Sequence, residues 1–114
     1  MAPRSQTSKS KGTPLPPLAG SIAKRFPRVW QAYAALGKEI ADAGPLNERE
    51  RRLVKLALAV GAGTEGGTHS HARQALAEGL TAEDIRHIAL LAITTTGWPA
   101  SAAALSWIED MLPK

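Results

Sequence analysis

The side chains best suited to chemistry gather in one short stretch of this chain. Glu65, His69 and His71 fall within seven consecutive residues, in a region otherwise dominated by alanine and glycine. Imidazole and carboxyl groups are the usual carriers of protons near neutral pH. The stretch is therefore a candidate site for proton transfer.

Helical geometry separates these side chains. At about 100° per residue, Glu65 projects within about 20° of the centre of the apolar stripe made by Ala72, Ala75, Leu76 and Gly79, so we expect it to point inward. His69 and His71 lie about 200° apart on the same wheel. They are expected to flank the stripe from opposite sides.

Plainer interpretations of each residue stay open. Glu65 also suits a helix start, where the dipole and a nearby arginine would neutralise it. Burial would raise its pKa and Arg51, Arg52 or Arg73 would lower it, so its protonation state is not fixed by the sequence. Either histidine alone is compatible with simple packing or solvent exposure.

Two other site classes are considered and not favoured. Glu65 and His69 have the i, i+4 spacing of metal ligands, but His71 and His87 face elsewhere, so no metal is predicted. Ala75, Gly79 and Ile85 match the spacing of a helix-turn-helix. The helix that follows is too apolar to read bases, so no nucleic-acid partner is expected.

Composition narrows the remaining classes. The chain has 114 residues, a net charge of +4 and no cysteine, which excludes disulfides and thiol chemistry. Residues 1–20 carry three basic side chains and no acid, with four prolines, and are predicted to be a disordered basic tail. Neither a signal peptide nor a membrane span is apparent, so a soluble cytoplasmic protein without membrane contact is expected.

The remainder, residues 21–114, is predicted to be one all-α domain. The chain has 21 alanines against nine valines and isoleucines, which favours helices. Apolar spacing and capping residues predict helices at 27–43, 47–60, 64–78, 81–97 and 99–112, in a compact bundle of about five to six helices. The second and fourth of these are apolar on more than one face, which indicates association between subunits.

Residues 44–110 resemble the carboxymuconolactone decarboxylase family, which includes the alkylhydroperoxidase D proteins. The resemblance rests on the order and spacing of several short features. These are Gly44-Pro45-Leu46, Arg51, Leu53-Val54, Glu65-Gly66, His71 with Arg73, Ala75 and Gly79, Thr81 with Asp84-Ile85, and Gly97-Trp98-Pro99-Ala100.

The resemblance distinguishes two branches of that family. The peroxidase branch uses a Cys-x-x-Cys pair and a glutamate, whose positions are occupied here by Thr64, Gly67 and Arg52. Without sulfur, thiol peroxidase activity is not expected. The lactone decarboxylase branch lacks the pair and is more similar, although Gly67 and Ser70 depart from it.

The resemblance thus implies a cofactor-free carboxy-lyase acting on a small anionic lactone, assembled as a trimer or hexamer. His71, supported by Glu65, would protonate carbon, and His69 or His71 would stabilise the charge on the carbonyl oxygen. Arg51 or Arg73 would bind the retained carboxylate and Trp98 would line the pocket. The alternative is a non-catalytic oligomeric module of the same fold that binds a small acid.

Overall fold

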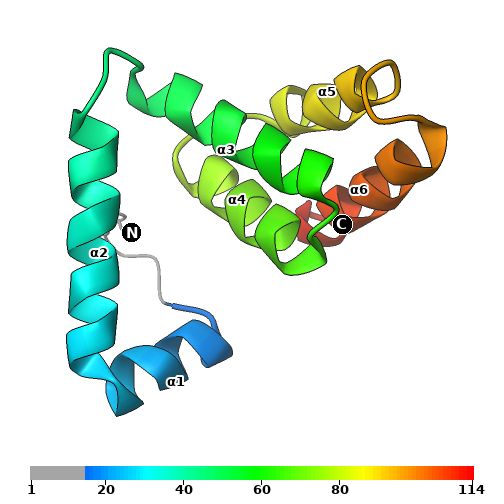
Figure 1. Ribbon diagram of the computed structural model, residues 1–114. Coiled ribbons are helices and arrows are strands. Elements are labelled where there is room, and N and C mark those ends of the chain that lie inside the picture. Colours follow the sequence, from blue (N-terminus) through cyan, green and yellow to red (C-terminus); the bar gives the residue numbers. More distant parts are fainter. Residues whose placement is uncertain (1–14) are drawn as a thin grey trace. The chain divides into compact units, whose positions relative to one another are not determined.

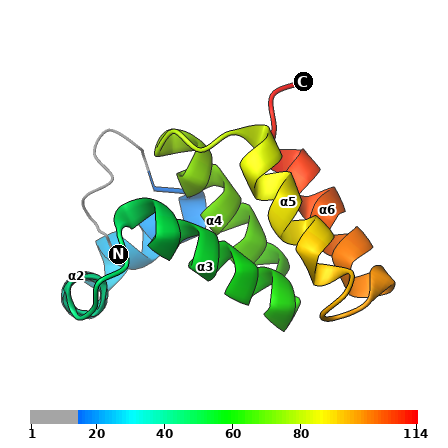
Figure 2. The same cartoon turned by 90° about the horizontal axis from the view of Figure 1, so that it is seen from above.

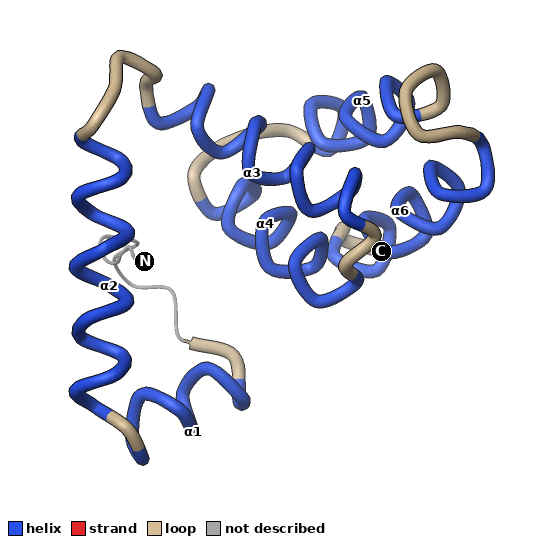
Figure 3. Tube along the Cα trace, viewed as in Figure 1, coloured by secondary structure: helices blue, strands red, loops and turns tan. Residues whose placement is uncertain are grey.

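The computed structural model describes residues 15–114, which form six helices joined by short loops (Figures 1 and 3). Within this range there is no strand, so the all-α prediction and its helix number are confirmed. The helices are α1 (Pro17–Arg25), α2 (Pro27–Asp42), α3 (Glu48–Ala62), α4 (Glu65–Ala77), α5 (Ala82–Ala92) and α6 (Trp98–Met111).

Contacts within the chain divide it into two compact units, and the boundary between them falls inside the segment predicted as one domain over 21–114. The first unit extends to Pro45 and includes α1 and α2, which pack on each other. The second, Leu46–Lys114, contains α3 to α6. The Gly44-Pro45 pair, which follows the helix predicted over 27–43, therefore lies at the boundary between the units.

The first helix begins inside the segment that was predicted to be a tail. The first 14 residues of this segment lie outside the described part of the chain, but α1 begins at Pro17, inside the segment predicted to be disordered. Proline suits the first turn of a helix because its fixed φ is helical and its missing N–H would have no partner there. The proline-rich composition of residues 1–20 obscured this helix start.

In the second unit each helix packs mainly on two others. α3 packs on α4 and α5, and α6 packs on the same two helices, whereas contacts across the two diagonals are fewer. Figure 2 shows α3 beside α4 and α5 beside α6. The functional candidates on α4 therefore lie between α3 on one side and α6 on the other.

The core of this unit combines a few large side chains with many alanines. Leu56, Ile85 and Ile108 are fully buried. Around them lie smaller or less completely buried apolar residues, namely Val60, Ala72, Ala75, Leu80, Ala89, Ala92, Ala104 and Leu112. Alanine at these positions lets neighbouring helices approach closely, which fixes the position of α4 against its neighbours.

Local sequence signals explain where these helices begin and end. Asn47 begins α3 with a capping box that includes Glu50. Thr81 begins α5 in the same way with Asp84. Gly79 has φ of +95°, a conformation that favours glycine, and it follows the end of α4 as predicted. The fourth predicted helix is shorter than expected, because α5 ends at Ala92 and turns replace its last residues.

Spanning a bilayer requires a long apolar helix. Among residues 15–114, none of the six helices has the length and apolar composition required.

Replacing Thr81 with alanine tests the α5 cap. The Thr81 hydroxyl accepts from the backbone N–H of Asp84 at 3.1 Å, and the Asp84 carboxylate accepts from the N–H of Thr81 at 2.8 Å. We expect Thr81→Ala to lower the free energy of unfolding by about 1 kcal/mol, measured by urea denaturation. The control is Thr94→Ala, an exposed turn residue, with an expected change of less than about 0.5 kcal/mol. Equal effects of the two variants would show that the cap contributes nothing specific.

Candidate functional site

Helix α4 carries the two clustered histidines on opposite sides, as the helical wheel predicted. His71 contacts Arg52 of α3, with 2.7 Å between its Nδ1 and an arginine Nη. His69 contacts Asp110 of α6, with 2.9 Å between Nε2 and Oδ2. The two residues therefore belong to two separate polar clusters.

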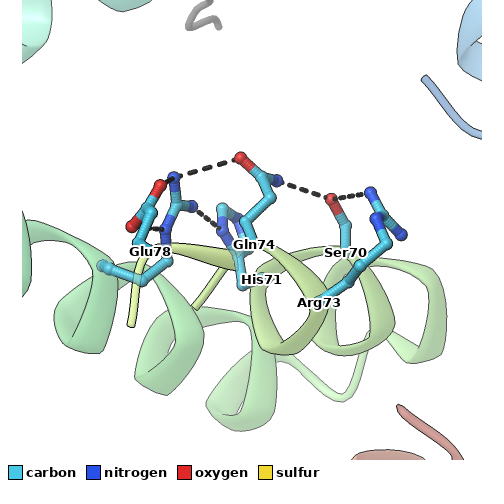
Figure 4. Close-up of polar contacts among 6 residues, drawn as sticks. Ser70, His71, Arg73, Gln74 and Glu78 are labelled. Atoms are coloured by element: carbon cyan, nitrogen blue, oxygen red, sulfur yellow. Dashed lines mark hydrogen bonds and ion pairs between the residues drawn. The ribbon is translucent and has the colours of Figure 1, made fainter. Parts of the chain in front are cut away.

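Arg52 is the centre of the first cluster. Its guanidinium binds both oxygens of Glu78, at 3.0 and 2.9 Å, and donates to Oε1 of Gln74 at 3.0 Å. Gln74 in turn donates to Oγ of Ser70 at 2.9 Å. Figure 4 shows this chain of part-buried contacts along one side of α4, with His71 in the middle of it. We call Arg52, Ser70, His71, Arg73, Gln74 and Glu78 the arginine network.

His71 is held neutral in this network. Burial is the main reason that its pKa falls from 6.5 to about 4, and the positive charges of Arg52, Lys55 and Arg73 lower it further. Arginine can only donate, so Nδ1 of His71 accepts and the imidazole proton lies on Nε2. Within residues 15–114 this Nε2–H makes no hydrogen bond, so it can donate to a ligand.

Arg73 lies at the other end of the network. One of its Nη atoms is 3.4 Å from the Ser70 hydroxyl, a long contact. Its Nε is buried and has no acceptor in the described part of the chain. Burial, followed by the charge of Arg52, lowers the pKa of Arg73, which nevertheless stays protonated at neutral pH. A buried N–H without an acceptor is costly. The long contact to Ser70 leaves the Nη atoms of Arg73 as the groups that could donate to a ligand.

The prediction that Glu65 points inward is wrong. Its side chain is exposed, and it lies near His69 and Asp110 rather than His71. The helical wheel gives the direction in which a side chain projects from the helix axis. It does not show whether that part of the helix lies beside the core or beyond its end. Glu65 is the first residue of α4, beyond the end of the core, and Thr68 and Ala72 take the buried positions. Glu65 therefore does not support His71.

Two predicted substrate contacts also lie elsewhere. Arg51 donates to the carbonyl of Leu46 and so holds the loop before α3. Trp98 is 62% exposed at the first residue of α6, neither in the core nor in the arginine network. It is about 18 Å along that helix from Asp110, at 1.5 Å per residue. Of the predicted carboxylate-binding arginines, only Arg73 lies in the network.

His87 is exposed on α5 and contributes to neither cluster. The candidate metal ligands considered from the sequence were Glu65 and His69, with His71 or His87 as the third. In the structure the third side chain is Asp110, whose ligand atom lies within 4.8 Å of those of Glu65 and His69. We call these three residues the carboxylate–imidazole cluster.

Sequence reasoning missed part of each cluster. Gln74 and Glu78 are three and seven residues after His71, a spacing that places all three on one face of a helix. This spacing is visible in the sequence and indicates that Gln74 and Glu78 lie near His71. Asp110 is 41 residues from His69, and nothing in its local sequence indicates the contact.

Comparison with known proteins identifies the family of this chain. Residues 27–110 match the carboxymuconolactone decarboxylase family, so the chain belongs to that family. It is also similar to an uncharacterized protein of Haemophilus influenzae, with 38% identity over 56 residues. The match covers 49% of this chain and 50% of that protein, so about half of each is compared. No solved structure matches.

The lowered pKa of His71 predicts acid sensitivity. The folded protein binds a proton at His71 only near pH 4, whereas the unfolded chain does so near 6.5, so stability is complete above 6.5 and falls as the pH drops towards 4. Through His71 alone, the free energy of unfolding should fall by about 2 kcal/mol between about pH 7.5 and about pH 5. Urea denaturation at both values measures it.

Substitution isolates the contribution of His71 from other titrating groups. In His71→Gln, the loss of stability between the two pH values should shrink by about the amount assigned to His71. The matched control, His87→Gln, removes an exposed histidine and should leave the pH dependence as in the wild type. A wild-type pH dependence in His71→Gln would contradict a neutral His71.

Proposed function

We propose that this protein is a cofactor-free carboxy-lyase, similar to 4-carboxymuconolactone decarboxylase, acting on a small anionic lactone or carboxylate. The observation that carries the proposal is the neutral His71 placed among the cations Arg52, Lys55 and Arg73. Family membership makes the reaction class reasonable, and the arginine network supplies groups suited to it.

The charge around His71 favours an anionic ligand. Three cationic side chains act on the imidazole, and one of them, Arg52, is paired with Glu78. An arriving carboxylate would reduce the repulsion that these cations exert on one another. The charge-assisted hydrogen bonds it accepts are stronger than neutral ones.

Arg73 is the residue suited to hold the carboxylate that remains after reaction. Its buried Nε lacks an acceptor among residues 15–114, whereas Arg52 already binds Glu78, Gln74 and His71. The Nη groups of Arg73 make one long contact, at 3.4 Å to Ser70, so they can donate to a carboxylate. Arg52 instead positions the imidazole.

His71 then acts on the reacting group. Its Nε2–H would donate to the lactone carbonyl oxygen, where negative charge develops as the carbon–carbon bond breaks and CO2 leaves. The electron pair of that bond passes into the conjugated lactone. A neutral imidazole N–H is a suitable donor for such an oxyanion.

Carbon must next receive a proton. A bound anion offsets part of the repulsion from Arg52, Lys55 and Arg73, so it raises the pKa of His71. The ring can take a proton from solvent at Nδ1 once Arg52 turns its N–H from that nitrogen to the anion. The imidazolium can give that proton to carbon and return to its neutral form. In this scheme Glu65 and His69, on the other side of α4, take no part.

One feature favours the alternative, a small-acid-binding module without catalysis. With a pKa of about 4, His71 is not an imidazolium at neutral pH before a ligand binds, so it lacks the second proton that a general acid would give to carbon. The same network would still bind a carboxylate. Binding without turnover is the result that would support this second function.

Turnover of γ-carboxymuconolactone tests the lyase proposal. We expect the purified protein to consume it, followed by the loss of ultraviolet absorbance and by CO2 release. His71→Ala should lower kcat/KM by about 100-fold or more, because it removes the donor and the acid together. Arg73→Gln should mainly raise KM, because it weakens carboxylate binding.

His87→Ala is the matched control, and its activity should equal that of the wild type. Substrate loss no faster than in buffer would reject this substrate. An unchanged rate in His71→Ala would reject the role of the arginine network.

We also propose that the chain assembles into a trimer or hexamer. The two helices with spare apolar faces in the sequence correspond to α3 and α5. α3 exposes Val54 and Leu58, one turn apart, and α5 exposes Leu90 and Leu91. Apolar surface of this kind commonly lies at subunit interfaces.

Light scattering after size-exclusion chromatography should give a mass several times 12.0 kDa. Leu58→Glu should shift the protein to a smaller species, because it places a charge in the apolar contact. Glu83→Gln, on an exposed residue outside these faces, is the control. A monomeric wild type would contradict the assembly.

A further inference from the structure

Glu65, His69 and Asp110, the carboxylate–imidazole cluster, form a second site that the proposed reaction does not use. Glu65 and His69 are one turn apart on α4, and Asp110 is the residue before the last of α6. One potential ligand atom from each residue lies within 4.8 Å of the other two. The two helices thus bring together one imidazole nitrogen and two carboxylate oxygens.

The charges in this cluster are poorly balanced. Glu65 makes no hydrogen bond or ion pair within residues 15–114. Asp110 lies in the last turn of α6, where the helix dipole disfavours a negative charge. Its neighbour Glu109 is held by Arg86 at 2.6 and 3.0 Å, whereas the partner of Asp110 is the His69 ring. Among the described residues, the two carboxylates therefore have one imidazole beside them and no ion pair with an arginine or lysine.

We propose that Glu65, His69 and Asp110 bind a divalent transition-metal ion. Imidazole together with carboxylate suits ions such as Zn²⁺, Co²⁺ and Mn²⁺, whereas Mg²⁺ and Ca²⁺ prefer sites made only of oxygen. The positive ion would offset both carboxylates at once. It would also compensate the unfavourable position of Asp110 at the end of α6.

The geometry agrees with such an ion. With metal–ligand distances of about 2.0 to 2.2 Å, ligand atoms lie about 3 to 4 Å apart. The 2.9 Å between Nε2 of His69 and Oδ2 of Asp110 is close to this range. The exposed Glu65 side chain can rotate to close the remaining distance. Three protein ligands leave one or more positions for water or a small anion.

The ion would also join two elements distant in sequence. Its ligands come from the first turns of α4 and the last turn of α6, so its binding energy adds to the stability of the folded unit. Because His69 and His71 project in different directions, this site is independent of the arginine network.

Calorimetric titration of ZnCl2 into the metal-stripped, untagged protein tests the site. We expect one Zn²⁺ per chain with a micromolar dissociation constant, and a rise in melting temperature on zinc addition. Glu65→Gln and Asp110→Asn, two exposed positions, should each weaken binding by roughly 10-fold or more. His69→Ala should abolish it.

The other two histidines provide the controls, because the chain has three in all. His87→Ala should bind zinc as the wild type does, and so should His71→Gln. The absence of zinc uptake at micromolar concentrations would overturn the proposal. So would wild-type affinity in both carboxylate variants, or loss of binding in His87→Ala.

Discussion

The contact of Arg52 with Glu78 is the interaction on which the candidate site depends. Both side chains are largely buried, at 13% and 14% exposure, and the two hydrogen bonds between them fix the plane of the guanidinium. The remaining N–H groups are thereby directed at His71 and Gln74. Removing either partner would leave a charge buried without compensation, which is far more costly than losing an exposed pair.

This one contact determines the state of the imidazole in two ways. It selects the tautomer, because an arginine donor at Nδ1 requires the proton on Nε2. It also holds the positive charge of Arg52 beside the ring, and this charge lowers the pKa of His71 further than burial alone does. Glu78, which never touches His71 directly in the network, therefore affects its chemistry through Arg52.

The sequence predicted those features that arise from short-range rules. The helix starts at 47 and 81 and the opposite directions of His69 and His71 were predicted correctly, because each depends on residues within a few positions. The buried position of Glu65 was wrong, because depth depends on where the neighbouring helices end. The pairing of His69 with Asp110 and the unit boundary at Pro45 depend on distant packing and had no local signal.

The placement of two clusters on opposite sides of one helix restricts how this segment can change during evolution. Each residue inserted or deleted between Glu65 and Glu78 would rotate everything beyond it by about 100°. His71 would then leave Arg52, or His69 would leave Asp110, and the alanines of the core would turn with them. Single substitutions can alter one side of α4 without affecting the other. The length of this stretch is therefore expected to stay constant among relatives even where its residues differ.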